Sequence, residues 1–258
     1  MRILTTLVFV AALAVPRAAF AQSDEIQVYD GGLAEPGTFN LTVHNNFIAN
    51  GAKTPAFAGG LIPDRSFNGV FEWAYGVTNW FEAGLYLPLY SISKDRGASI
   101  NGGKIRLLFA VPNADERRFV YGGNFEFSYN SKHWDERHFT AEIRPIVGVH
   151  LHSVDLIFNP ILDHSWAGGF KSLEFAPATR IAYNVSSTWA VAIEEYADVG
   201  PLRGAFPGSE QSHELYGVFD HASARFMDVE AGIGFGLTHG SNKLTLKLIL
   251  SRDLNKTP

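Results

Sequence analysis

The chain of 258 residues contains no cysteine. It therefore has no disulfide framework, no thiolate metal site or nucleophile, and no residue at which a lipoprotein could be acylated. Long apolar runs are also scarce: the first, of about 13 residues, is shorter than the roughly 20 that a spanning helix needs, and no later run reaches that length without a charge. Clusters of lysine and arginine are missing, which removes the electrostatic basis for binding nucleic acid. Redox proteins, lipoproteins, helical membrane proteins and nucleic-acid-binding proteins are thus left without support.

Residues 1–21 have the three parts of a cleavable signal peptide. Arg2 supplies a positive region, residues 3–15 are apolar, and Ala19, Phe20 and Ala21 form an A-x-A cleavage signal. Cleavage there leaves 19 basic against 26 acidic side chains. The sequence predicts a secreted protein of a Gram-negative bacterium, with residues 22–258 as a single domain and residues 22–38 as its periplasmic lead segment.

The most informative feature of the mature chain is a repeated alternation of apolar and polar side chains. In residues 67–76, for example, Phe71, Trp73 and Tyr75 share one face and Glu72 lies on the other. A period of two is the signal of a β-strand. Twelve segments show it, at residues 39–48, 67–76, 81–90, 102–111, 119–130, 137–147, 150–158, 172–184, 188–197, 213–220, 225–237 and 243–254. This pattern predicts an all-β fold, a closed antiparallel up-and-down transmembrane β-barrel of about 12 strands.

Short and long connections alternate between these segments along the chain. The short ones lie near residues 77, 112, 148, 185 and 222, and the longer ones span residues 50–65, 91–101, 131–136, 159–171, 198–212 and 238–242. Outer-membrane barrels have short periplasmic turns and longer external loops. The long connections are therefore expected outside the cell.

Charged side chains follow the polar faces of the predicted strands. We expect them to form a charge network in the lumen, made by Glu72, Glu82, Arg106, Glu126, Glu142, Arg144, Glu174, Arg180, Glu194, Glu230 and Lys247, with Lys104 on the same face as Arg106. Such a network either lines a selective pore or packs a narrow barrel with paired charges. The sequence leaves both open.

Catalytic and metal-binding patterns are weak. His221 and Ser223 have the i, i+2 spacing that puts two side chains on one strand face, but no third group orients them, so we expect no enzyme activity. His150 and His152 are the only close histidine pair on one strand face, and two imidazoles without a third ligand do not make a metal site. No metal or cofactor is expected.

The five tryptophans lie mostly near predicted strand ends or in loops. They are Trp73, Trp80, Trp134, Trp166 and Trp189. Girdles of aromatic side chains at the two membrane interfaces explain that placement without a ligand.

Several stretches resemble the proteobacterial outer-membrane proteins named for the meta-cleavage pathway of phenol degradation. The similar stretches are residues 25–30, 35–37, 72–80, 124–126, 142–146, 158–163 and 232–238. The resemblance spans nearly the whole mature chain and implies an outer-membrane barrel associated with aromatic catabolism. It carries over no catalytic residue.

We therefore expect a porin-like transport protein of the outer membrane that passes or binds small solutes, including aromatic or hydrophobic ones, with outer-membrane lipid as its other partner. Two alternatives stay open. One is a closed structural or surface-interaction barrel without transport activity. The other is a soluble periplasmic ligand-binding β-barrel, in which the apolar faces would point inward, because alternation alone does not distinguish lipid-facing from core-facing side chains.

Overall fold

The computed structural model describes residues 24–165, 173–223 and 226–255. The predicted signal peptide and Trp166 lie outside this part of the chain. Its elements are β1 (Phe39–Asn50), β2 (Ser66–Thr78), β3 (Phe81–Ser93), β4 (Gly97–Ala110), the 3₁₀ helix η1 (Ala114–Glu116), β5 (Phe119–Asn130), β6 (Phe139–Leu151), β7 (Val154–Asn159), β8 (Leu162–Ser165), β9 (Glu174–Phe175), β10 (Ala178–Asn184), β11 (Trp189–Asp198), β12 (Gly200–Pro201), β13 (Ser212–His221), β14 (Asp228–Gly236) and β15 (Leu244–Asp253). In the described residues, no helix is long and apolar enough to cross a membrane.

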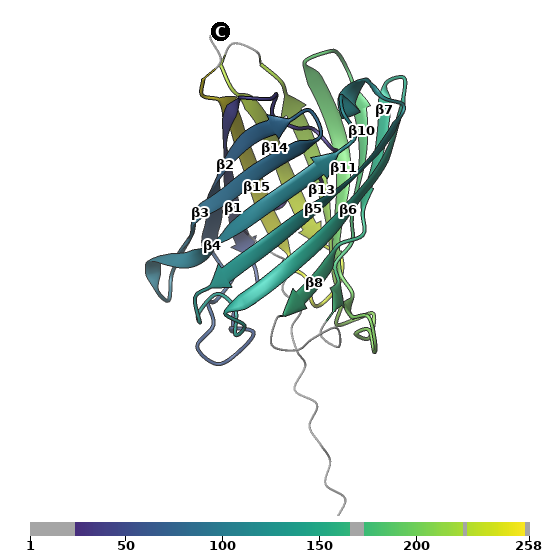
Figure 1. Cartoon of the computed structure of the whole chain (residues 1–258). Coiled ribbons are helices and arrows are strands. Elements are labelled where there is room, and N and C mark those ends of the chain that lie inside the picture. The colour runs from purple at the N-terminus through teal and green to yellow at the C-terminus, as the bar shows by residue number, and fades with distance from the viewer. Residues whose placement is uncertain (1–23, 166–172, 224–225, 256–258) are drawn as a thin grey trace, which may run out of the picture.

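These strands form one closed antiparallel barrel (Figure 1). β15 pairs with β1, and β7 pairs with both β6 and β10, so the sheet has no gap between its first and last strands. β8 continues β7 along β6, while β9 and β12 extend β10 and β11 at one end of the barrel. The segments therefore make a barrel of 12 spanning strands, which confirms the predicted fold class.

Prolines explain where the spanning strands are interrupted. β7 ends at Asn159, directly before Pro160, and β10 begins at Ala178, directly after Pro177. Proline has no backbone N–H to give to a ladder, so it breaks regular pairing. The register between β3 and β4 also shifts at Pro88. At Pro145 the register with β5 continues without a shift.

The two ends of the barrel differ in their connections. One end, the turn end, has the short connections together with the start of β1 and the end of β15. The other, the loop end, has the connections at residues 51–65, 131–138 and 202–211 and lies at the bottom of Figure 1. The long connection expected at residues 91–101 is wrong: β3 and β4 continue to Ser93 and Gly97 and leave a three-residue turn. Small serines on the inner face obscured the alternation in that stretch.

Apolar side chains cover the outside of the barrel and polar ones line its inside. Ile105 is 56% exposed and Phe119 is 64% exposed, whereas Asn124 and Glu126 are 0% and 1% exposed. A soluble barrel needs the reverse arrangement, because apolar surface in water is unfavourable. The burial pattern thus contradicts the soluble alternative and fits a lipid-facing wall.

Residues 24–34, here called the lumen segment, lie inside the barrel, where we had expected a periplasmic lead. Asp24, Glu25 and Tyr29 are 1%, 4% and 5% exposed, and their partners all belong to the inner wall. The physical reason is that the inner wall supplies cations and apolar recesses for these side chains. Gly37, which follows the segment, bonds to the β2 residue Gly76 at the turn end.

Candidate functional site

The lumen segment is held first by buried charges. Asp24 approaches Lys104 on β4, with Oδ2 2.8 Å from Nζ, and the β5 residue Glu126 lies 3.4 Å from the same nitrogen. Glu25 lies between two cations, 3.8 Å from Lys104 Nζ and 3.7 Å from Nη1 of Arg144 on β6. Since these side chains are at most 3% exposed, each carboxylate depends on protein cations rather than on water.

Apolar contacts also hold the same segment against the inner wall. Tyr29 packs in a cluster with Leu108, Val120 and Ile146, and Val28 packs in a cluster with Ile157 on β7. Asn159 clamps the backbone of Tyr29, since its amide oxygen accepts from the Tyr29 N–H at 2.7 Å and its amide nitrogen donates to the Tyr29 carbonyl at 2.9 Å. The acidic residues at the start of the segment thus meet cations of the inner wall, and the apolar residues that follow meet apolar parts of it.

Gly76 makes room for the chain at the turn end. A Cβ at this position would collide with the carbonyl oxygens of Ala34 and Glu35. The Gly76 carbonyl accepts a hydrogen bond from Gly37 N–H at 2.8 Å. This close approach fixes where the chain leaves the lumen before β1 begins.

A second charge cluster surrounds Arg106 on β4. Its Nη1 lies 2.8 Å from Glu72 Oε1 and also donates to the Tyr29 hydroxyl at 3.2 Å, while Nη2 pairs with Glu82. The remaining oxygen of Glu72 contacts His44 Nε2 at 3.0 Å. All these groups lie on the inner faces of β1 to β4, so the cluster links four strands and the lumen segment.

A third cluster occupies the opposite wall, on β10 to β15. Lys247 pairs with Glu194 and, at 2.6 Å, with Glu230. Arg180 pairs with the same Glu194 and with Asp220. The two cations hold three carboxylates, which leaves this wall acidic overall.

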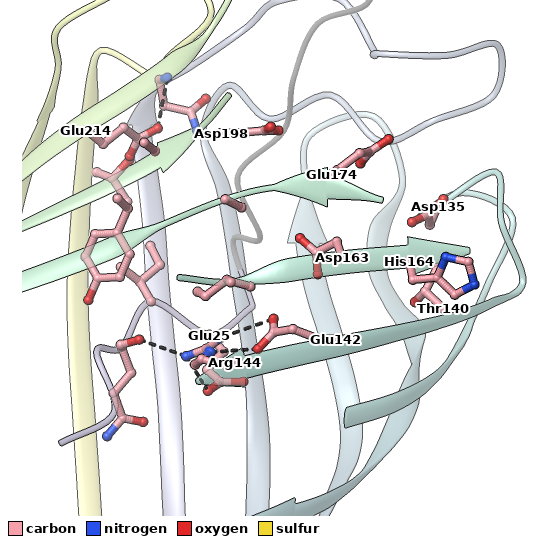
Figure 2. A pocket seen from close by; sticks show the side chains of 18 of the residues that line it. Glu25, Asp135, Thr140, Glu142, Arg144, Asp163, His164, Glu174, Asp198 and Glu214 are labelled. Atoms are coloured by element: carbon pink, nitrogen blue, oxygen red, sulfur yellow. Dashed lines mark hydrogen bonds and ion pairs between the residues drawn. The ribbon is translucent and has the colours of Figure 1, made fainter. Parts of the chain in front are cut away.

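A cavity of about 140 Å3, here called the loop-end cavity, lies between the lumen segment and the loop end. It is lined by seven carboxylates against two guanidinium groups, and Figure 2 shows most of them converging on one space. The acidic lining residues are Glu25, Asp135, Glu142, Asp163, Glu174, Asp198 and Glu214, and the basic ones are Arg137 and Arg144. The lumen is therefore filled on the turn side and open, with an acidic lining, on the loop side.

Both guanidinium groups are already engaged. Arg144 lies 2.6 Å from Glu142, and Arg137 lies 3.1 Å from Asp135 and 3.5 Å from Glu174. Partial burial alone would lower the pKa of Arg137, but its hydrogen bond with Asp135 and the nearby Glu174 hold that pKa above its ordinary value. Arg137 therefore stays charged and paired at any physiological pH.

The predicted network residues all lie on inner faces, but they do not form one network. Glu72, Glu82 and Arg106 belong to the first wall, and Arg180, Glu194, Glu230 and Lys247 to the opposite one, with Glu126, Glu142 and Arg144 beside the lumen segment. Glu174 stands apart, since its side chain is 34% exposed at the loop end.

Sequence reasoning missed several acidic residues that shape the lumen, among them Asp24, Glu25, Asp163 and Asp198. Asp24 and Glu25 are the third and fourth residues after the predicted cleavage site. The available signal was their adjacent charges, followed by the apolar residues Ile26, Val28 and Tyr29. Asp163 and Asp198 were hidden because each lies where a proline or glycine interrupts the strand pattern.

The histidine patterns considered for catalysis or metal binding have other partners. His221 contacts the Thr188 carbonyl oxygen and stacks on Trp189, and His150 pairs with Asp155 at 2.5 Å. No group of three or more potential metal ligands comes together among the described residues.

The tryptophans at the turn end fit the expected aromatic girdle. Trp80 stacks with Phe109, and Trp189 packs against Phe219, with both tryptophans more than 40% exposed on the outer surface.

Comparison with known proteins places the fold among outer-membrane barrels. No family model matches the chain, and no curated protein matches it. Among solved structures, an outer-membrane channel from Pseudomonas putida F1 is similar with a TM-score of 0.58 and 13% identity, covering 89% of this chain and 100% of that chain. The KdgM porin, in complex with disordered oligogalacturonate, has a TM-score of 0.51 and 7% identity over 84% of this chain and 99% of its own. The NanC porin has a TM-score of 0.50 and 8% identity, covering 84% of this chain and 100% of its own.

Proposed function

We propose that the protein is a narrow outer-membrane channel for small polar solutes, with a preference for cations. The observation that carries the proposal is the loop-end cavity, whose lining has seven carboxylates and two guanidinium groups. Rings of charged side chains select ions by sign in other channels. The channel and porins of similar fold support a transport role, and the exposed apolar wall supports the outer-membrane location.

In this proposal the loop end faces outside the cell, because long connections are external in outer-membrane barrels. Solutes then enter the acidic cavity first and meet the lumen segment deeper in the barrel. The segment limits the flow, because its side chains fill the space between the two charged walls.

A test is the current through a planar lipid bilayer to which the purified mature protein is added. We expect small conductance steps and a reversal potential, in a KCl gradient, that shows preference for K⁺. The control is a variant lacking residues 24–34, which should conduct more. If neither the intact protein nor this variant carries current, and both are shown to be folded, the channel proposal is overturned.

A second candidate function is a closed structural barrel. It is favoured by the filling of the turn-end half of the lumen by the lumen segment and its ion pairs. It predicts no current from the intact protein and none of the ligand effects described below.

Passage of aromatic or hydrophobic solutes, which the family resemblance implies, is a further possibility for the same channel. Tyr86 and Tyr216 present rings to the lumen, but buried cations lie over them: Lys104 is 5.6 Å from the Tyr86 centroid and Lys247 5.7 Å from the Tyr216 centroid. The charged lining supports polar cations better.

A further inference from the structure

The loop-end cavity has a surplus of carboxylates that the described residues do not neutralise. Asp163 has no hydrogen bond or ion pair with any residue in the described part of the chain. Among the same described residues, Asp198 accepts only the Gly200 N–H, at 2.9 Å, and Glu214 accepts from Tyr216 and from Asn242 N–H. Three of the seven lining carboxylates therefore have no cation within ion-pair distance in the described part of the chain.

The strand register makes this arrangement unfavourable in the empty barrel. Glu142 on β6 lies opposite Asp163 on β8, and Asp163 lies opposite Glu174 on β9. Like charges directly opposite each other across a sheet destabilise it. A cationic ligand in the cavity would remove that repulsion, whereas a neutral or anionic one would not.

Glu25 at the floor of the cavity is an independent sign of a ligand. Its side chain is 0% exposed, it lines the cavity, and neither of its carboxylate oxygens accepts a hydrogen bond from a described residue. Its cations, Arg144 and Lys104, are 3.7 Å and 3.8 Å away, beyond hydrogen-bond distance. A buried carboxylate with unused acceptors is costly unless a donor reaches it.

The spacing of the carboxylates selects the kind of cation. No group of three or more acidic or histidine side chains among the described residues is close enough to hold a metal ion. The cavity of about 140 Å3 is also far larger than the roughly 10–15 Å3 that one water needs by this measure. The carboxylates are thus distributed around the cavity rather than gathered at a point.

The lining also has apolar and aromatic side chains. They include Ile48, Ile161 and Ala176 and the rings of Tyr196 and Tyr216. Methylene groups pack on such side chains, and ammonium groups are attracted to tyrosine faces.

We propose that the loop-end cavity binds an aliphatic diamine or polyamine, with ammonium groups at Asp163, Asp198 and Glu25 and a methylene chain along Ile161 and Ala176. This inference rests on the proposed channel function and specifies the solute class. Binding needs no change in the barrel, since the ligand enters the cavity from the loop end.

The test is calorimetric titration of spermidine into the intact mature protein in detergent at low salt. We expect saturable binding that weakens as salt is added. Asp163→Asn and Asp198→Asn should each weaken binding by about fivefold or more, because each removes one charge contact. Glu136→Gln is the matched control, since Glu136 is exposed in the same loop region outside the cavity, and it should leave binding unchanged. Butylamine, with a single ammonium group, should bind much more weakly than spermidine.

Binding equal in all three variants, absence of saturable binding, or equal binding of butylamine would overturn the inference. Tighter binding of Mg²⁺ than of spermidine would overturn it in favour of an inorganic cation. Two aspartate variants are used so that a folding defect in one leaves the other informative. The mobility of the unheated protein in a gel shows whether each variant has formed the folded barrel. Conductance without spermidine binding refutes only this inference, whereas binding without conductance supports it and refutes the channel proposal.

Discussion

Replacing Lys104 with methionine should release the lumen segment. Lys104 is the cation nearest to Asp24, at 2.8 Å, and it also lies 3.4 Å from Glu126 and 3.8 Å from Glu25. Methionine keeps most of the apolar stem of lysine, so the change removes the charge and little of the packing. Three buried carboxylates then lose a shared partner.

The size of the effect follows from the burial of these groups. Removing one partner of a buried ion pair costs about 3–5 kcal/mol, because the remaining charge is left without compensation. The barrel avoids that cost if the segment moves into water, where Asp24 and Glu25 are hydrated. A shift of 3 kcal/mol changes the equilibrium between bound and released segment by roughly 150-fold.

The absence of cysteine makes the measurement direct. In a Val28→Cys background the single thiol lies in a buried apolar contact, since Val28 is 6% exposed and packs against Ile157. The rate at which a bulky maleimide labels this thiol reports how often the segment leaves the lumen. Lys104→Met should raise that rate by about 100-fold or more. Lys243→Met is the control, because Lys243 is an exposed lysine at the loop end whose side chain donates to the Thr238 carbonyl and forms no ion pair with a described residue.

A second substitution checks that charge is the cause. Adding Asp24→Asn to Lys104→Met removes one of the uncompensated carboxylates, so the labelling rate should fall back by about tenfold. A Lys104→Met rate within about threefold of the Lys243→Met control, with the barrel folded, would show that the ion pairs do not retain the segment.

The remaining predictions test other parts of the reasoning. Gly76→Ala should destabilise the protein by about 1–3 kcal/mol in a urea titration in lipid vesicles, because the added Cβ meets the backbone that leaves the lumen; an unchanged midpoint would contradict that contact. Arg106→Met should lower the free energy of unfolding by about 3–5 kcal/mol, and the exposed Arg117→Met by less than about 0.5 kcal/mol, in the same titration. Ile105→Arg places a charge on the outer wall and should cost about 2–4 kcal/mol, which a soluble barrel would not show. Deleting residues 24–34 should increase single-channel conductance, and an equal conductance would mean that the segment does not obstruct the path.

The charged inner wall illustrates how much of the site is readable from a sequence. That Glu72, Arg106 and Lys247 lie on the face opposite the apolar side chains of their strands follows from the period of two, because neighbouring strand residues always point to opposite sides. The period of two does not show which of these charged residues pair. Arg106 pairs with Glu72 and Glu82 on the two preceding strands, and Lys247 pairs with Glu194, 53 positions away in the sequence. Pairing depends on strand register and barrel curvature, which no local pattern contains.

The lumen segment illustrates the opposite case. It is part of residues 22–38, which we interpret from the sequence as a periplasmic lead because they carry glycines and a proline and precede the first regular strand. Nothing local indicates that Asp24 and Glu25 meet Lys104 and Arg144, which lie about 80 to 120 residues further along the chain. The loop-end cavity was equally hidden, because its carboxylates come from separate strands and connections.

The sequence by itself determined the number of spanning strands, which side chains share a face of each strand, and the end at which most of the long connections gather. These features depend on a local alternation that every strand repeats. The tertiary structure alone decided which face of the wall meets water, what fills the lumen, and where a cavity remains, because these depend on closure of the sheet and on the space left between opposite walls.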